Sequence, residues 1–218
     1  MIEDNIKNIL SELPADVRLL AVSKFHPAEA LMEAYSAGQV LFGESRPQEF
    51  QAKAKALPGD IEWHFIGHLQ HNKLKMVLPY ASLVESIDSR RLLEAVNAWG
   101  EKNGKVINCL LELHLGSELS KGGFAAEEIE EVLSEAASFP FVSFKGLMGM
   151  ATNTDDEAVI RSDFSRIADL KARLTAAHPE LADFTELSIG MSNDWRIAIE
   201  YGSTIVRIGT AIFGPREY

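Results

Sequence analysis

Short apolar runs alternate with segments of helical spacing along the whole chain. The runs have the length and the β-branched and aromatic content of strands. Strands that alternate with helices favour a parallel sheet whose helices form right-handed crossovers. The predicted strands are residues 18–23, 39–44, 61–67, 82–87, 105–114, 142–150, 184–190 and 204–209.

The segments between the runs contain signals for helix starts. Residues 1–12 predict one extra helix before the first strand, and a helix begins at Pro27, where proline is tolerated in the first turn. Thr154 and Glu157 have the spacing of a capping box. They predict the start of a long helix that continues to residue 177.

Eight strand–helix units in 218 residues predict a (β/α)8 barrel, which forms one domain over residues 1–218. A doubly wound open sheet has the same alternation, so periodicity leaves it open as an alternative. The chain ends soon after the last strand. We therefore expect no further domain over the mouth of the barrel.

Composition narrows the classes of function. The net charge is −11, from 21 Lys and Arg against 32 Asp and Glu, which argues against general affinity for nucleic acid or anionic membranes. The single cysteine, Cys109, lies in an apolar run and is interpreted as a buried small hydrophobe. The N-terminus does not resemble a signal peptide, and no apolar run is long enough to span a bilayer. We expect a cytoplasmic protein.

The last two apolar runs end in small polar residues. Ser192 follows the seventh run, and Gly209 and Thr210 follow the eighth. Backbone N–H groups and hydroxyls at strand ends bind anions, typically phosphate. Lys24 lies at the exit of the first run. Because a barrel brings its first and last strands together, we expect a lysine and an anion site on one rim.

Each of these residues also has a structural interpretation. Lys24 can be a surface lysine of the rim, or a neutral amine in an apolar mouth that forms a Schiff base with an aldehyde or ketone. Ser192 can cap the following helix, and Gly209 can form a tight turn. Arg207 interrupts an apolar strand, so its buried guanidinium needs a partner, either a ligand or a carboxylate such as Glu112.

Three histidines, His64, His68 and His71, suggest a metal site. Gly67 and the strand character before it interrupt the helix that would bring them together. No cysteine pair or carboxylate cluster completes the ligand set. We therefore predict no metal. The dinucleotide-binding, P-loop and nucleophile-elbow motifs are also absent from the sequence.

Six motifs extend in order over nearly the whole chain. They are residues 21–24 (AVSK), 63–73 (WHFIGHLQHNK), 86–89 (SIDS), 146–148 (GLM), 187–194 (LSIGMSND) and 202–214 (GSTIVRIGTAIFG). Together they resemble the pyridoxal phosphate homeostasis protein family. That resemblance implies a barrel related to the N-terminal domain of alanine racemase.

The resemblance also implies a cofactor and a set of contacts. Pyridoxal 5′-phosphate (PLP) would be held as an aldimine on Lys24. Ser192 and the backbone N–H groups of Gly209 and Thr210 would hold its phosphate, and Arg207 would face its pyridine nitrogen. One motif departs from the family, since residues 42–46 read FGESR where the family usually reads FGENY. We do not transfer a cofactor contact to that position.

These expectations favour a PLP carrier over a strong catalyst. A guanidinium only donates, so a pyridine nitrogen facing Arg207 stays unprotonated and the ring is a weak electron sink. Racemisation also needs an acid and a base on opposite faces of the substrate, and Lys24 supplies one face. We therefore predict a monomer that takes part in intracellular vitamin B6 homeostasis and has PLP-dependent apoenzymes as partners. The alternatives are a PLP-dependent racemase completed by a partner chain, or a Schiff-base barrel enzyme acting on another phosphorylated carbonyl.

Overall fold

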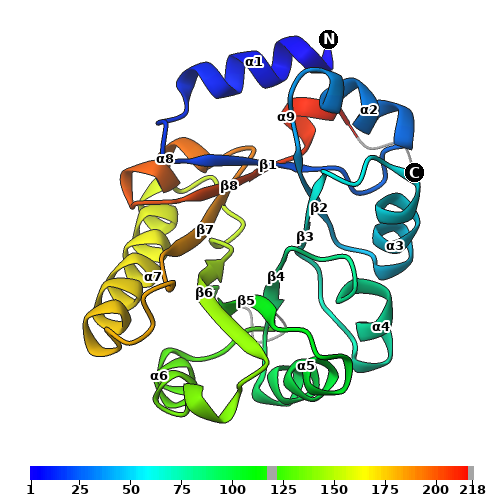
Figure 1. Cartoon of the computed structure of the whole chain (residues 1–218). Coiled ribbons are helices and arrows are strands. Elements are labelled where there is room, and N and C mark those ends of the chain that lie inside the picture. Colours follow the sequence, from blue (N-terminus) through cyan, green and yellow to red (C-terminus); the bar gives the residue numbers. More distant parts are fainter. Residues whose placement is uncertain (117–121, 216–218) are drawn as a thin grey trace.

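The computed structural model describes residues 1–116 and 122–215. Within these ranges, eight parallel strands form a closed barrel in sequence order, with β8 paired to β1 (Figure 1). Closure excludes the doubly wound open sheet. The strands are β1 (Arg18–Val22), β2 (Leu41–Glu44), β3 (Glu62–Phe65), β4 (Leu83–Ile87), β5 (Ile107–Leu113), β6 (Val142–Gly149), β7 (Glu186–Met191) and β8 (Ile205–Ile208).

Helices surround the barrel (Figure 1). They are α1 (Ile2–Glu12), α2 (Ala28–Ser36), α3 (Pro47–Ala56), α4 (Leu74–Val77), α5 (Arg90–Asn103), α6 (Ala126–Ser134), α7 (Glu157–Ala177), α8 (Trp195–Glu200) and α9 (Thr210–Phe213), with the 3₁₀ turns η1 (His71–Lys73) and η2 (Ala136–Ser138). The predicted extra helix is α1, and the Asn5 side chain donates to the Ile212 carbonyl of α9 at 2.9 Å. None of the helices in the described ranges is long and apolar enough to cross a membrane.

The predicted strands are confirmed, with ends that differ by at most a few residues, but the predicted capping box is wrong. The N-cap of α7 is Asp156, whose carboxylate accepts the Ala158 N–H at 2.9 Å. Thr154 instead accepts the N–H of Asp156 at 3.1 Å. Aspartate is at least as good an N-cap as threonine, so the helix starts two residues after the spacing predicts.

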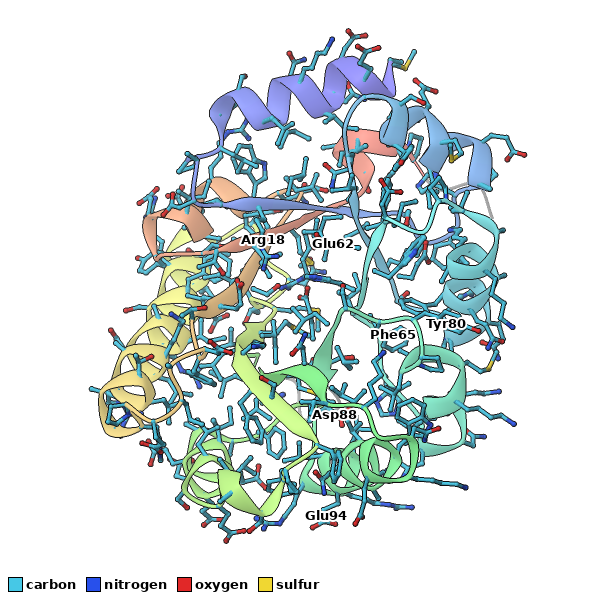
Figure 2. The ribbon with its side chains drawn as sticks, in the orientation of Figure 1. Arg18, Glu62, Phe65, Tyr80, Asp88 and Glu94 are labelled. Carbon is cyan, nitrogen blue, oxygen red and sulfur yellow. The ribbon has the colours of Figure 1, made fainter. Side chains whose placement is uncertain are left out.

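Side chains alternate between two cores along each strand. Those that face outward pack against the helices, as Phe65 does, with its ring centroid 5.6 Å from that of Phe50 on α3 (Figure 2). Those that face inward fill the barrel. An inner cluster of buried apolar side chains makes the interior a packed core: Leu20, Leu41, Leu83, Leu110, Met148 and Ile205.

Candidate functional site

The carboxyl ends of β7, β8 and β1 are neighbours on one rim of the barrel. The register pairs Met191 with Arg207 and Ala21 with Ile208. A Cβ added to Gly209 would lie 2.9 Å from the carbonyl oxygen of Val22, so the end of β8 contacts the end of β1. Lys24 follows Val22 by two residues. The structure thus confirms that the lysine and the last strand share a rim.

Lys24 is half-buried at the start of the loop after β1. The next residue, Phe25, has a φ of 70°, in the left-handed region that non-glycine residues rarely adopt. The Arg46 guanidinium lies 4.2 Å from the centre of the Phe25 ring. The His26 and Phe213 rings stack at 4.9 Å, which joins this loop to α9. The departure from the family pattern at residues 45–46 therefore places an arginine against the residue that follows Lys24.

Ser192 is half-buried in the turn between β7 and α8. It does not cap α8, because the helix begins at Trp195 and its N-cap is Asp194. The Asp194 carboxylate accepts the Met191 N–H and closes the turn. Gly190 permits this arrangement, since its φ is 94° and an added Cβ would lie 2.7 Å from the Ala198 side chain. The interpretation of Ser192 as a helix cap is wrong.

Gly209 is the N-cap of α9 and is half-buried, while Thr210, the first residue of that helix, is exposed. The close approach of Gly209 to Val22 explains this glycine without a ligand. The same contact keeps the backbone of residues 209 and 210 at the rim that Lys24 shares. The structural and ligand-binding interpretations of Gly209 are compatible.

Arg207 is buried inside the barrel with 5% exposure. Its Nη1 donates to the carbonyl oxygen of Ser188 at 2.6 Å and to its hydroxyl at 2.7 Å, and Nη2 donates to the Gly149 carbonyl at 2.8 Å. Burial lowers the pKa of Arg207, and the carboxylates of Glu85 and Glu112 act in the opposite direction. The guanidinium is held in one orientation by three hydrogen bonds to neighbouring strands.

Arg207 belongs to a hydrogen-bonded network inside the barrel, called here the interior network. Its members are four buried side chains: His64, Glu85, Ser188 and Arg207. The Ser188 hydroxyl donates to Glu85 Oε2 at 2.6 Å, and His64 Nδ1 lies 2.6 Å from Glu85 Oε1. Burial alone raises the pKa of the Glu85 carboxyl. The hydrogen bond to His64, the charge of Arg207 and the hydrogen bond from Ser188 outweigh it, so that pKa lies below its usual value.

The sequence suggests Glu112 as another partner for Arg207. The two groups interact through their charges, whereas the hydrogen bonds of the guanidinium go to Ser188 and Gly149. Burial, followed by the nearby charge of Asp88, raises the pKa of Glu112 to about 7, while Arg207 and His68 oppose the rise. A carboxyl group at the end of β5 therefore titrates near neutral pH.

The three histidines of residues 63–73 do not form one site. His64 contacts Glu85 inside the barrel, while His68 Nδ1 lies 2.7 Å from a carboxylate oxygen of Asp88 at the rim. Asp88 precedes α5 (Figure 2). Among the described residues, no group of three or more His, Cys, Asp or Glu side chains is placed to hold a metal ion.

The sequence and fold match known proteins over nearly the full chain. The family described as "Alanine racemase, N-terminal domain" matches residues 1–217. A pyridoxal phosphate homeostasis protein of Vibrio alginolyticus is 39% identical over 232 residues, which cover 100% of this chain and 98% of that protein. The chain belongs to the pyridoxal phosphate homeostasis protein family.

Solved structures agree with this assignment. PipY of Synechococcus elongatus PCC7942 without PLP has a TM-score of 0.93 and 35% identity, covering 98% of this chain and 100% of PipY. The PipY structure with PLP bound has a TM-score of 0.90 at the same identity and coverage. Alanine racemase of E. faecalis shares the fold, with a TM-score of 0.74 and 18% identity, and the match covers 98% of this chain and 57% of the racemase.

Glu85 is the member of the interior network next to Arg207 and Ser188 that the sequence analysis did not single out. The signal was present, because Glu85 interrupts the apolar strand Leu83–Ile87 just as Arg207 interrupts Ile205–Ile208. Two opposite charges, each inside a buried strand of one barrel, are candidates to pair. Their link through Ser188 depends on strand register, which the sequence pattern does not give.

Proposed function

We propose that this chain binds pyridoxal 5′-phosphate, with residues 1–218 as one cofactor-binding domain. The observation that carries the proposal is the placement of Lys24 beside the end of β8, where Gly209 approaches Val22. The relatives named pyridoxal phosphate homeostasis protein and the PLP-bound PipY structure support the same cofactor. PLP supplies an aldehyde that condenses with amines and a ring that withdraws electrons.

The residues on the rim fit the parts of this cofactor. The Lys24 amine would form a Schiff base with the aldehyde. Ser192 and the N–H groups of Gly209 and Thr210 would hold the phosphate, because hydroxyl and backbone N–H donors suit an anion. Arg207 would donate to the pyridine nitrogen. Its three hydrogen bonds to Ser188 and Gly149 fix the guanidinium before any ligand arrives, which favours this contact.

We further propose that the protein carries PLP without strong catalysis. Arg207 stays charged and only donates, so it would keep the pyridine nitrogen unprotonated and the ring a weak electron sink. The relatives carry the name of homeostasis proteins, which supports this role. A part in vitamin B6 homeostasis with PLP-dependent apoenzymes as partners, a cytoplasmic location and a monomeric state stay predictions.

The test is the absorption spectrum of the purified chain after incubation with PLP. We expect a visible Schiff-base band that Lys24→Ala abolishes. Lys105→Ala is the matched control, because Lys105 is also partly buried and donates to the backbone carbonyls of Leu78 and Pro79. A wild-type protein without the band, or a Lys24→Ala variant that keeps it, contradicts the proposal.

A second measurement separates carrier from racemase. The PLP-loaded protein is incubated with single L-amino acids, and the optical rotation is followed. We expect no change on the time scale of PLP binding. Rapid loss of optical activity that depends on Lys24 would overturn the non-catalytic assignment and leave PLP binding intact.

A further inference from the structure

A second group of polar and charged side chains lies at the carboxyl ends of β1 and β2, between the sheet and α3. This strand-1 cluster consists of Ser23, Glu44 at the end of β2, and Glu49 and Lys53 on α3. Lys53 Nζ lies 2.7 Å from Glu44 Oε1 and 2.7 Å from Glu49 Oε1. The side chains of Lys53 and Glu44 are 9% and 0% exposed, so this is a buried ion cluster rather than a surface pair.

The cluster holds the peptide groups on both sides of Lys24. Lys53 Nζ donates to the carbonyl oxygen of Ser23 at 2.9 Å, and Glu49 Oε1 accepts the Phe25 N–H at 2.8 Å. The Ser23 hydroxyl donates to Glu44 Oε1 at 2.7 Å. One lysine and its carboxylate partners thus fix the backbone immediately before and after Lys24.

We propose that Lys53 is a positioning residue for Lys24: with Glu44 and Glu49 it clamps the backbone at residues 23 and 25, so that the Lys24 amine is held at the rim for the aldehyde of PLP. This inference rests on the proposed function. It adds three residues, none of which touches the cofactor, to those that decide how well PLP is captured.

Two features of the cluster favour a geometric role. Phe25 keeps a left-handed backbone, and such a conformation persists where surrounding contacts determine it; the Glu49 bond to its N–H is one of these contacts. The cluster is also costly to bury, since well-packed apolar side chains stabilise a core at least as well as a buried ion group. Among the described residues, Glu44 Oε2 is a buried side-chain oxygen without a hydrogen-bond partner.

The titration of Glu44 points the same way. Burial raises the pKa of its carboxyl, and the charge and hydrogen bond of Lys53, with the hydrogen bond of Ser23, only partly compensate. A cluster kept for stability alone would not need this carboxyl group. Glu44 instead holds Lys53, and the backbone bonds of Lys53 to Ser23 and of the Phe25 N–H to Glu49 are contacts that apolar residues cannot replace.

The experiment compares wild type with Lys53→Met during capture of PLP. The rate of appearance of the visible band is measured on equal concentrations of folded protein. The ratio of visible circular dichroism to absorbance is measured on the same samples, because it reports how rigidly the bound chromophore is oriented. We expect capture at least about tenfold slower in Lys53→Met, because misplacement of a reacting group costs rate steeply, together with a lower dichroism ratio.

Three further variants separate positioning from stability. Glu49→Ala removes the acceptor of the Phe25 N–H and keeps the Lys53–Glu44 pair, so it tests the clamp if Lys53→Met does not fold. Glu49→Gln keeps an oxygen acceptor, and we expect it to restore most of the wild-type rate. Phe50→Leu loosens the packing of the same helix α3 against Phe65 and changes no residue of the cluster, and we expect the wild-type dichroism ratio.

The outcomes are distinct. If wild type shows no visible band, the proposed function fails. If wild type shows the band, and both Lys53→Met and Glu49→Ala match its rate and dichroism ratio, the positioning role is wrong while PLP binding stands. If Phe50→Leu lowers the dichroism ratio as much as Glu49→Ala does, the effect is general loosening of α3 and the inference is overturned.

Discussion

The interior network and the strand-1 cluster are two buried polar groups on opposite sides of the barrel wall. The interior network lies inside the barrel and pairs one carboxylate, Glu85, with one guanidinium, Arg207, through Ser188. The strand-1 cluster lies between the barrel wall and α3 and gathers two carboxylates around the one ammonium of Lys53. The first holds a charged side chain inside the barrel, whereas the second holds the backbone on either side of Lys24.

This difference determines what each group contributes. Arg207 would touch the ligand, so the network that holds it combines stability with recognition. Lys53 lies behind the wall and acts through hydrogen bonds to main-chain atoms. We therefore expect variants of the interior network to affect stability most, and variants of the strand-1 cluster to affect PLP capture most.

The largest expected effect is that of Glu85→Ala. This change removes the carboxylate that acts most strongly on the buried charge of Arg207, and breaking one side of a buried ion pair costs about 3–5 kcal/mol. Urea unfolding at neutral pH measures the loss. We expect Glu49→Ala to cost less, about 1–2 kcal/mol, because Glu49 is 21% exposed and Lys53 keeps Glu44. Equal losses in the two variants would contradict the comparison.

A second prediction concerns the pH dependence of the unfolding free energy, which we assign to the buried carboxyl group of Glu112 at the end of β5. The folded-state pKa of Glu112 is about 7, above the ordinary 4.5, so the folded protein holds a proton that the unfolded chain releases. Its contribution is fully present below pH 4.5 and is lost as pH rises to 7, by roughly 3 kcal/mol. Glu112→Gln should remove this slope.

Unfolding free energies at several pH values between 4 and 8 test this prediction. The difference between wild type and Glu112→Gln isolates the one group, since Glu44 and Asp194, whose pKa values burial also raises, are common to both proteins. Parallel stability curves for the two proteins would show that Glu112 does not titrate in this window.

Much of the fold was predictable because its signals are local. Each strand is a short apolar run, and each run is separated from the next by residues of helical spacing, so the strand bounds follow to within a few residues. The start of α7 could not be predicted in this way, because Thr154 and Asp156 are both good N-caps and only the path of the chain decides between them. Periodicity alone left closure of the sheet open; the count of eight strand–helix units predicted a barrel, and the pairing of β8 with β1 confirms it.

The candidate site divides in the same way. Lys24, Ser192 and Arg207 stand out at strand ends or inside an apolar run. Lys53 does not, because Glu49 and Lys53 are four residues apart on a helix, as in many exposed ion pairs, and their burial depends on the approach of Glu44 from β2. Contacts that depend on which element packs behind a strand leave no periodic trace in the sequence.

A third prediction concerns the contact between Gly209 and Val22, which lies between the interior network and the strand-1 cluster. Gly209 follows Arg207 by two residues and contacts Val22, which precedes Ser23 of the strand-1 cluster. In Gly209→Ala the new methyl group would lie 2.9 Å from the Val22 carbonyl oxygen, so β1 and β8 must move apart. We expect a loss of about 1–3 kcal/mol in unfolding free energy, and weaker PLP binding at equal folded fraction. Unchanged stability and binding would show that this contact relaxes freely.

The smallest effect is expected at the opposite end of β1, where Arg18 pairs with Glu186 of β7 at 2.7 Å. The pair joins β1 to β7, two of the strands whose carboxyl ends meet at the rim. The Arg18 side chain is 44% exposed, so water screens the pair. Arg18→Ala should therefore cost at most about 1 kcal/mol in urea unfolding and leave the rate of PLP capture unchanged. A loss as large as that of Glu49→Ala would mean that β1 depends on ion pairs along its whole length. The difference in exposure between the Arg18–Glu186 pair and the strand-1 cluster would then no longer explain why only the cluster affects PLP capture.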